Sequence, residues 1–136
     1  MAVQKLIKYT AEHHRKEGIS PEAFLEWFRE EHLSNGLPIL KKYGITRYAV
    51  HTRLPNECAA FRVDLEKVKP SWVISDADLV IEYWLPSMDV LKDLSADTEW
   101  NEKAIKGLGN WLDSSKTVVH IGYETVYMEN GNIINI

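Results

Sequence analysis

The stretch SPEAFLEWFREEH, residues 20–32, most constrains how this chain can fold, because it carries both a helix start and a long apolar stripe. Ser20 suits the N-cap and Pro21 suits the first helical position. At helical spacing, one side of this helix carries Phe24, Trp27, Phe28, Glu31 and His32. Burying an imidazole without a partner is costly. We therefore expect His32 either to be satisfied inside the fold or to point into a pocket.

The bulk composition indicates one domain spanning residues 1–136. Its 45% hydrophobic and 26% charged residues are ordinary for a soluble protein, and a net charge of −4 with scattered basic residues argues against nucleic acid. The N-terminal stretch is too short and too charged for a signal peptide, and no apolar run reaches membrane-spanning length. We expect a cytoplasmic protein with no membrane partner. Cys58 is the single cysteine, which excludes an internal disulfide.

Hydrophobic periodicity predicts the order β-α-α-β-loop-β-α-β along the chain. Strands are expected at residues 2–10, 45–54, 77–85 and 117–128. Helices are expected at residues 20–33, 37–43, 88–94 and 97–107. Ser34, Asn35 and Gly36 are predicted to end the first helix, Gly44 follows the second, and Asp97 is predicted to cap the last.

The connecting segments carry three further predictions. Residues 11–19 are predicted to be a polar connection, with His13 and His14 as surface histidines. Residues 55–76 are the least regular part, and we expect a pocket-covering loop with a short helix before Pro70, since long connections inside compact domains often carry function. The tail ENGNIINI combines turn residues with apolar ones and is expected to pack on a partner.

Two βαβ-like halves predict an α+β fold with a ferredoxin-like, four-stranded antiparallel sheet and helices on one face. In the third strand, Leu79, Ile81, Tyr83 and Leu85 form a plain core face. The opposite face, with Asp78, Glu82 and Trp84, is expected to meet water, a cavity or another subunit. Because that face carries large residues and no helix, the pattern predicts a homodimer that buries it.

The sequence offers acid and base groups but no cofactor or metal motif. There is no metal-ligand spacing, no phosphate-binding glycine pattern and no nucleophile elbow, so we expect neither a metal nor a cofactor. The remaining histidines, acids and tyrosines are the equipment of general acid–base catalysis. Which of these side chains meet in space is not decided by their spacing. His51 lies between Arg47 and Arg53 on one strand face, which favours either an anion-binding patch or an exposed face.

The segment GISPEAFLEWFREEH, following KLIKY, resembles the opening of EthD-domain proteins. DLVIEYWLPSMDVLKDL is similar to the third strand and following helix of that family, and TVVHIGYE is similar to its closing strand. The family often continues as HAPL after the helix histidine, whereas this chain has HLSNGLP. The resemblance implies a dimeric α/β barrel, in which two ferredoxin-like protomers pair their sheets. It also implies similarity to cofactor-independent fungal enzymes of polyketide biosynthesis, in secondary metabolism, namely decarboxylases, dehydratases and cyclases.

On this basis we expect a cofactor-independent lyase that acts on an aromatic or polyketide intermediate. His32 is the first candidate acid–base group, His120 the second, and Asp78 a carboxylate that orients one of them. The predicted substrate-binding residues are Tyr9, Phe28, Tyr48, His51, Glu82, Trp84, Asp97 and Trp100. The alternatives are a cofactor-free monooxygenase acting on an anthrone-type substrate and a non-catalytic binding protein for an aromatic metabolite.

Overall fold

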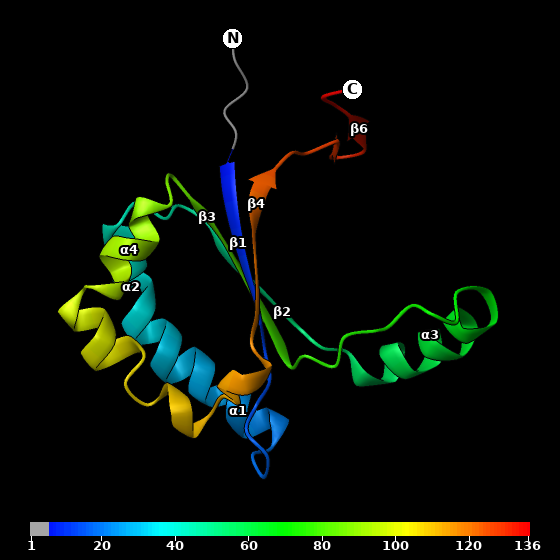
Figure 1. Cartoon of the computed structure of the whole chain (residues 1–136), viewed down its shortest axis with the longest axis horizontal. Helices are drawn as coiled ribbons and strands as arrows, with labels where there is room; N and C mark the ends of the chain where they lie inside the picture. Colours follow the sequence, from blue (N-terminus) through cyan, green and yellow to red (C-terminus); the bar gives the residue numbers. More distant parts are fainter. Residues whose placement is uncertain (1–5) are drawn as a thin grey trace.

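The computed structural model describes residues 6–136, which form a four-stranded antiparallel sheet with helices layered on one face (Figure 1). The strands are β1 (Leu6–His13), β2 (Tyr48–Thr52), β3 (Leu79–Leu85) and β4 (Val118–Glu124). Their order in the sheet is β2-β3-β1-β4, so the first and third strands are central. This arrangement confirms the predicted ferredoxin-like α+β class. Residues 2–5 of the predicted first strand lie outside the described residues.

The first helical segment is longer than predicted. It runs as α1 (Pro21–Trp27), the π-helical η1 (Phe28–Leu33) and α2 (Ser34–Lys42). Ser20 caps it, since its hydroxyl accepts the Ala23 N–H at 3.1 Å, as the sequence predicts. The predicted stop at Ser34, Asn35 and Gly36 is wrong, because Gly36 is buried inside the helix, where its lack of a side chain admits Trp100. The segment ends before Gly44, whose φ of +86° suits glycine, as predicted.

The second helical segment follows β3 and precedes β4 in the chain, and it completes the helix layer. It consists of α4 (Asp89–Ser95), the π-helical η2 (Trp100–Ala104), and the 3-10 turns η3 (Leu108–Asn110) and η4 (Ser114–Lys116). Asp97 caps the helical turn that leads into η2, as predicted, because its Oδ1 accepts the Trp100 N–H at 2.8 Å. Its Oδ2 accepts from Lys42 Nζ at 2.9 Å and from the Tyr43 hydroxyl at 2.5 Å, which ties the two helical segments together.

The structure differs from three of the predicted boundaries. β1 continues to His13, which therefore stands on the sheet and not in a connection. Residues 55–68 form a full helix, α3 (Pro55–Val68), which projects away from the sheet and covers no part of the helix layer (Figure 1). The closing strand ends at Glu124, and the tail folds into a hairpin of β5 (Met128–Glu129) and β6 (Asn132–Ile133). No helix within residues 6–136 is long and apolar enough to cross a bilayer.

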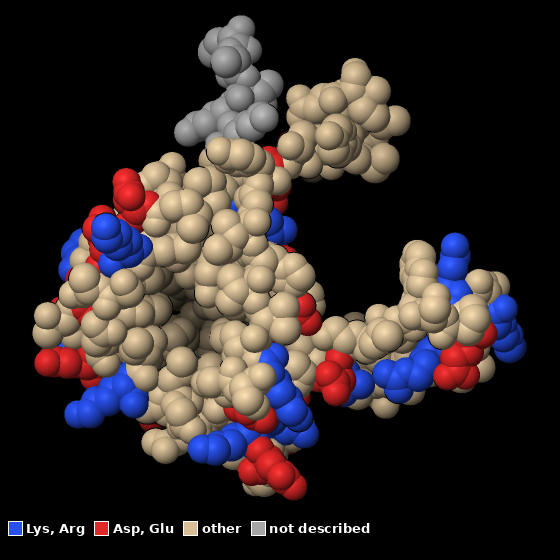
Figure 2. Space-filling view, viewed as in Figure 1, with Lys and Arg blue, Asp and Glu red and all other residues tan. Residues whose placement is uncertain are grey.

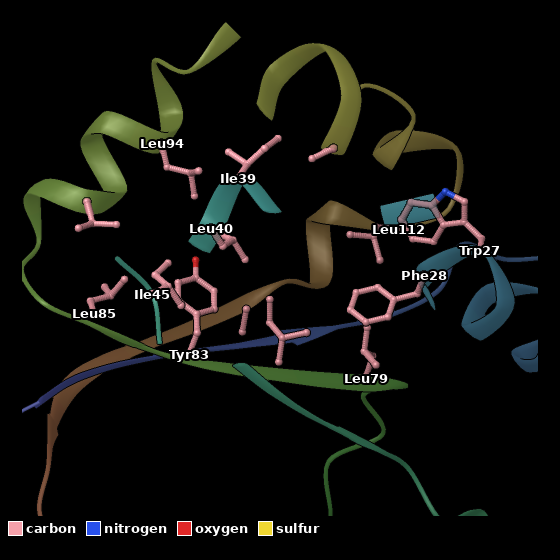
Figure 3. Packing of buried hydrophobic residues seen from close by; sticks show 14 of the residues in the cluster. Trp27, Phe28, Ile39, Leu40, Ile45, Leu79, Tyr83, Leu85, Leu94 and Leu112 are labelled. Carbon is pink, nitrogen blue, oxygen red and sulfur yellow. The ribbon is translucent and has the colours of Figure 1, made fainter. Parts of the chain in front are cut away.

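The core lies between the sheet and the helix layer (Figure 3). As predicted, Leu79, Ile81, Tyr83 and Leu85 on β3 are buried on the helix side. They pack under Phe24 of α1, which is fully buried, and under side chains of α2 and α4. Burial of such apolar side chains is the main favourable contribution to folding.

Truncating a leucine side chain to alanine should destabilise the fold more when that side chain is more deeply buried. Leu85 is 1% exposed, so Leu85→Ala should lower the free energy of unfolding by about 2–5 kcal/mol. Leu37 is 39% exposed, so Leu37→Ala, the matched control, should cost less than about 1 kcal/mol. Urea unfolding followed by circular dichroism measures both. Equal losses for the two variants would contradict this account of the core.

Candidate active site

A cavity of about 160 Å³ lies between the sheet and the helix layer. Figure 2 shows the molecule hollowed in this region. Most of the lining is aromatic or aliphatic. Its polar groups are two histidines and three tyrosines, namely His13, His32, Tyr9, Tyr48 and Tyr83. The sheet provides all of these except His32, which the helix layer provides, so the polar groups meet across an apolar space.

His32 is held in a cage of aromatic rings. The Phe28 ring stacks on the imidazole, with ring centroids 5.2 Å apart. The centroids of the Trp27 and Trp100 rings lie 5.9 and 6.0 Å from that of the imidazole. Phe28 and His32 lie within η1, whose wider turn also leaves Glu31 exposed, contrary to its predicted place on the apolar stripe. π-helical turns within α-helical segments are frequent at functional sites.

One ring nitrogen of His32 has a defined partner. Nδ1 lies 2.9 Å from the carbonyl oxygen of Ala104, at the end of η2. Carbonyls at a helix end lack partners within the helix, so this bond satisfies both groups. Because a carbonyl can only accept, Nδ1 carries the proton and Nε2 of the neutral ring carries a lone pair. Burial lowers the pKa of His32, and the Ala104 carbonyl partly offsets that effect.

His13 is the second imidazole of the cavity. It projects from the end of β1, and its Nδ1 lies 3.2 Å from the Thr117 hydroxyl. Burial lowers the pKa of His13 to about 4, and the nearby His32 and His14 act in the same direction. His13 and His32 are therefore both neutral near pH 7, which suits groups that accept or share protons in an apolar site.

The three tyrosines form one row across the sheet. In the strand register Tyr9 pairs with Tyr83, and Tyr83 pairs with Tyr48. Their rings stack, with centroids 4.6 Å apart for the first pair and 5.6 Å apart for the second. Burial raises the pKa of all three phenols, so they stay protonated and can donate hydrogen bonds. The Tyr48 hydroxyl is buried and has no hydrogen-bond partner among residues 6–136.

The cavity brings together five of the residues that the sequence proposes for the site. They are His32, Tyr9, Phe28, Tyr48 and Trp100. The other six line no part of it. Asp97 acts as the helix cap described above, and Asp78 pairs with Arg15, from which it accepts the backbone N–H at 2.9 Å. His51 is exposed on β2, on the sheet face opposite the helices.

The remaining three lie on that same uncovered face, because side chains alternate along a strand. His120 is exposed, and its Nε2 lies 2.8 Å from Glu12 Oε2. Glu82 is paired with Lys8, at 3.3 Å. Trp84 donates from Nε1 to Glu124 Oε1, at 2.6 Å. These polar groups form a connected surface, separated from the cavity by the thickness of the sheet.

Sequence reasoning did not propose nine of the cavity residues, and three of these carry a ring, namely His13, Tyr83 and Trp27. His13 was placed in a loop, although the alternation of Tyr9, Ala11 and His13 extends the first strand and could have placed it on the sheet. The sequence places Tyr83 on the core face and among the tyrosines suited to acid–base chemistry, but does not propose it for the site. Trp27 is placed on the apolar stripe alone. Among residues 6–136 there is no group of three or more metal-ligating side chains placed to hold an ion.

Comparison with known proteins finds a family model, sequence relatives and solved structures that match this chain. The model of the EthD domain matches residues 16–115. The dehydratase iacD of Pestalotiopsis fici is 43% identical over all of this chain and 98% of its own length. The conidial pigment biosynthesis dehydratase EthD of Metarhizium robertsii is 26% identical over 96% of this chain and 91% of its own. A dimeric ferredoxin-like protein of Thermobifida fusca superposes with a TM-score of 0.51 at 12% identity, over 87% of this chain and 90% of that one.

The two neutral histidines should make stability fall in mild acid. The folded chain binds these protons less readily than the unfolded chain, whose histidines titrate near 6.5. Stability is therefore retained above that pH and decreases as the pH falls towards 4, by roughly 3 kcal/mol for His13. Urea unfolding at stepped pH measures the slope. His13→Gln should flatten it, whereas an unchanged slope would show that His13 titrates normally when folded.

Proposed function

Because this chain belongs to the EthD-domain family, we propose that it is a dehydratase that removes water from an aromatic or polyketide intermediate. Two relatives that match nearly the full length of the chain are named dehydratases, which supports this reaction over decarboxylation or cyclisation. One observation carries the proposal for the site. A neutral His32 with a lone pair on Nε2 shares an apolar cavity with the Tyr48 hydroxyl, which has no hydrogen-bond partner in the described part of the chain.

The proposed reaction starts from a ketone with a hydroxyl on the β carbon. Nε2 of His32 takes a proton from the carbon between these groups, and negative charge builds on the carbonyl oxygen. The Tyr48 phenol donates a hydrogen bond to that oxygen, which stabilises the charge as it forms. The C–O bond to the β hydroxyl then breaks as the C=C bond forms. The imidazolium of His32 returns its proton to the departing hydroxide, so the products are water and the unsaturated ketone.

The lowered pKa of His32 suits the second half of this reaction. A buried imidazolium is a stronger acid than an exposed one, which favours transfer of its proton to the leaving group. The same burial makes His32 a weaker base, so the hydrogen bond from Tyr48 is needed to acidify the substrate. His13 is neutral, and His32 lies close enough to lower the pKa of His13. We propose that His13 orients the leaving hydroxyl. Only proton transfers are needed, so the proposed chemistry uses no redox cofactor.

The shape and lining of the cavity support a flat substrate. The tyrosine row forms one wall, and Trp27, Phe28 and Trp100 belong to the opposite one. Aromatic faces pack well against planar rings. We propose that the substrate ring lies between these walls, with its oxygen atoms directed towards Tyr48 and His13.

We also propose that the protein works as a homodimer. The sheet face opposite the helices carries cations and carboxylates in alternation, including Lys8 between Glu82 and Glu124 at 3.3 and 3.5 Å. A patch that bears both charges can pair with itself about a two-fold axis. The name of the Thermobifida fusca neighbour describes that protein as dimeric, which supports the same assembly here. Size-exclusion chromatography with light scattering tests this, and a monomer would contradict it.

Loss of the His32 base should abolish most of the turnover. His32→Gln should lower kcat about 10²–10⁴-fold on a β-hydroxytetralone probe, followed by the absorbance of the aromatised product. Tyr48→Phe should also lower kcat, since it removes the donor while keeping the ring. Thermal unfolding and retained binding of the probe, measured by Trp fluorescence, establish that both variants are folded.

The same assay separates the competing assignments. His120→Gln changes a histidine on the opposite face of the sheet and should leave turnover unchanged; a large loss there would transfer the catalytic role to His120. Oxygen consumption by the wild-type protein would indicate the monooxygenase alternative. Binding without product, for the probe and for related hydroxylated aryl ketones, would indicate a carrier and would contradict the dehydratase proposal.

A further inference from the structure

The 55–76 arm, meaning α3 and the segment that returns along it, leaves several of its apolar side chains exposed. Figure 1 shows it extending away from the sheet and the helix layer. Leu65 is the buried residue of α3, while Phe61, Val68 and Trp72 are 57, 72 and 63% exposed. Isolated helices of this length are marginal in water, and exposed apolar patches of this kind mark interaction surfaces. The arm therefore presents an apolar surface that is suited to a partner.

An apolar groove lies at the root of this arm, with an open volume of about 410 Å³. Its walls are formed by Leu54, Cys58, Phe61, Ile74, Ala77 and Val80. Val80 lies on the sheet face opposite the helices, so the groove is continuous with that face. Arg53 lies at the edge of the groove, and its Nε is buried without a hydrogen-bond partner among residues 6–136.

The C-terminal hairpin, residues 127–133 with strands β5 and β6, also exposes apolar side chains. Tyr127, Met128 and Ile133 are 55, 63 and 69% exposed. A two-stranded hairpin on its own is at best marginally stable in water. The hairpin carries one charged side chain, Glu129, which has no ion pair within the described part of the chain.

A chain cannot fill its own groove with its own hairpin, because the two lie at opposite ends of the sheet (Figure 1). Both extend on the side of the sheet that the helices leave uncovered. We propose that the hairpin of one copy docks in the arm groove of a second copy, and that the exchange is reciprocal. A two-fold axis across the strands brings each arm to the partner's hairpin, so both contacts form together.

The chemistry of the two surfaces agrees with this pairing. Apolar side chains of the hairpin meet the apolar walls of the groove, and Glu129 of one copy meets Arg53 of the other. Neither Arg53 nor Glu129 forms an ion pair within residues 6–136, and the contact would supply one to both. The inference rests on the proposed homodimer and adds the segments that join it. It is independent of the proposed dehydration chemistry.

Cross-linking tests the contact directly, because Cys58 in the groove is the single cysteine of the chain. Ile133→Cys adds a thiol to an exposed hairpin position. With a short bifunctional maleimide, this variant should give a covalent dimer on a denaturing gel. Leu37→Cys, in the helix layer, should give no such dimer with Cys58. Adding Cys58→Ser to Ile133→Cys should abolish the cross-link.

A pair of substitutions on one helix provides the second test. Phe61 and Val63 are each 57% exposed on α3, but only Phe61 lines the groove. Phe61→Glu should weaken dimerisation at least about tenfold in Kd, measured by sedimentation, since it places a charge against apolar side chains. Val63→Glu should leave the Kd within about twofold, as expected for an exposed position.

The outcomes are distinguishable. A dimer that forms no cross-link between Cys58 and position 133, and that responds equally to Phe61→Glu and Val63→Glu, would overturn the hairpin–groove contact while leaving the proposed homodimer intact. A wild-type monomer would overturn both. Loss of dehydratase activity in the His32 variant has no bearing on either result.

Discussion

The hydrogen bond between His32 Nδ1 and the Ala104 carbonyl is the interaction on which the candidate site depends. It joins the π-helical part of the first helical segment to that of the second, so the two halves of the helix layer meet at the imidazole. The bond also selects the tautomer, which leaves the lone pair on the other nitrogen. The contact that holds the layer together therefore also defines which nitrogen of His32 is free to accept a proton. The structural role of His32 and its proposed chemical role thus depend on the same hydrogen bond.

The sheet complements this arrangement by keeping its two faces chemically distinct. The face towards the helices carries the tyrosine row and His13, which are protonated phenols and a neutral imidazole in an apolar space. The opposite face carries Lys8, Glu12, Glu82 and Glu124 in ion pairs and hydrogen bonds. Alternation along each strand therefore separates the site proposed for proton transfer from the surface proposed for assembly.

Local sequence patterns predicted the parts of the fold that local chemistry decides. Ser20 as a cap, the buried alternation on β3 and the turn at Gly44 all follow from short-range rules. Elsewhere, packing between distant segments outweighs such short-range rules. Gly36 lies inside a helix, where Trp100 packs against it. Glu31 is exposed because it lies in the π-helical turn. The site was predicted in part for the same reason. His32 could be recognised from its own helix, whereas His13 depends on where β1 ends and His120 on which face of β4 it occupies.

The close approach at Gly36 has a consequence for the range of molecules that the hollow can accept. A β carbon at this position would lie 3.2 Å from the Trp100 ring, which is tighter than ordinary contact. Trp100 is also part of the cavity wall and of the cage around His32. An added methyl group at residue 36 would therefore press on the indole that lines the hollow, without altering any proton-carrying atom. Under the proposed function, the width of the substrate and the transfer of protons depend on different residues, so one can diverge while the other is preserved.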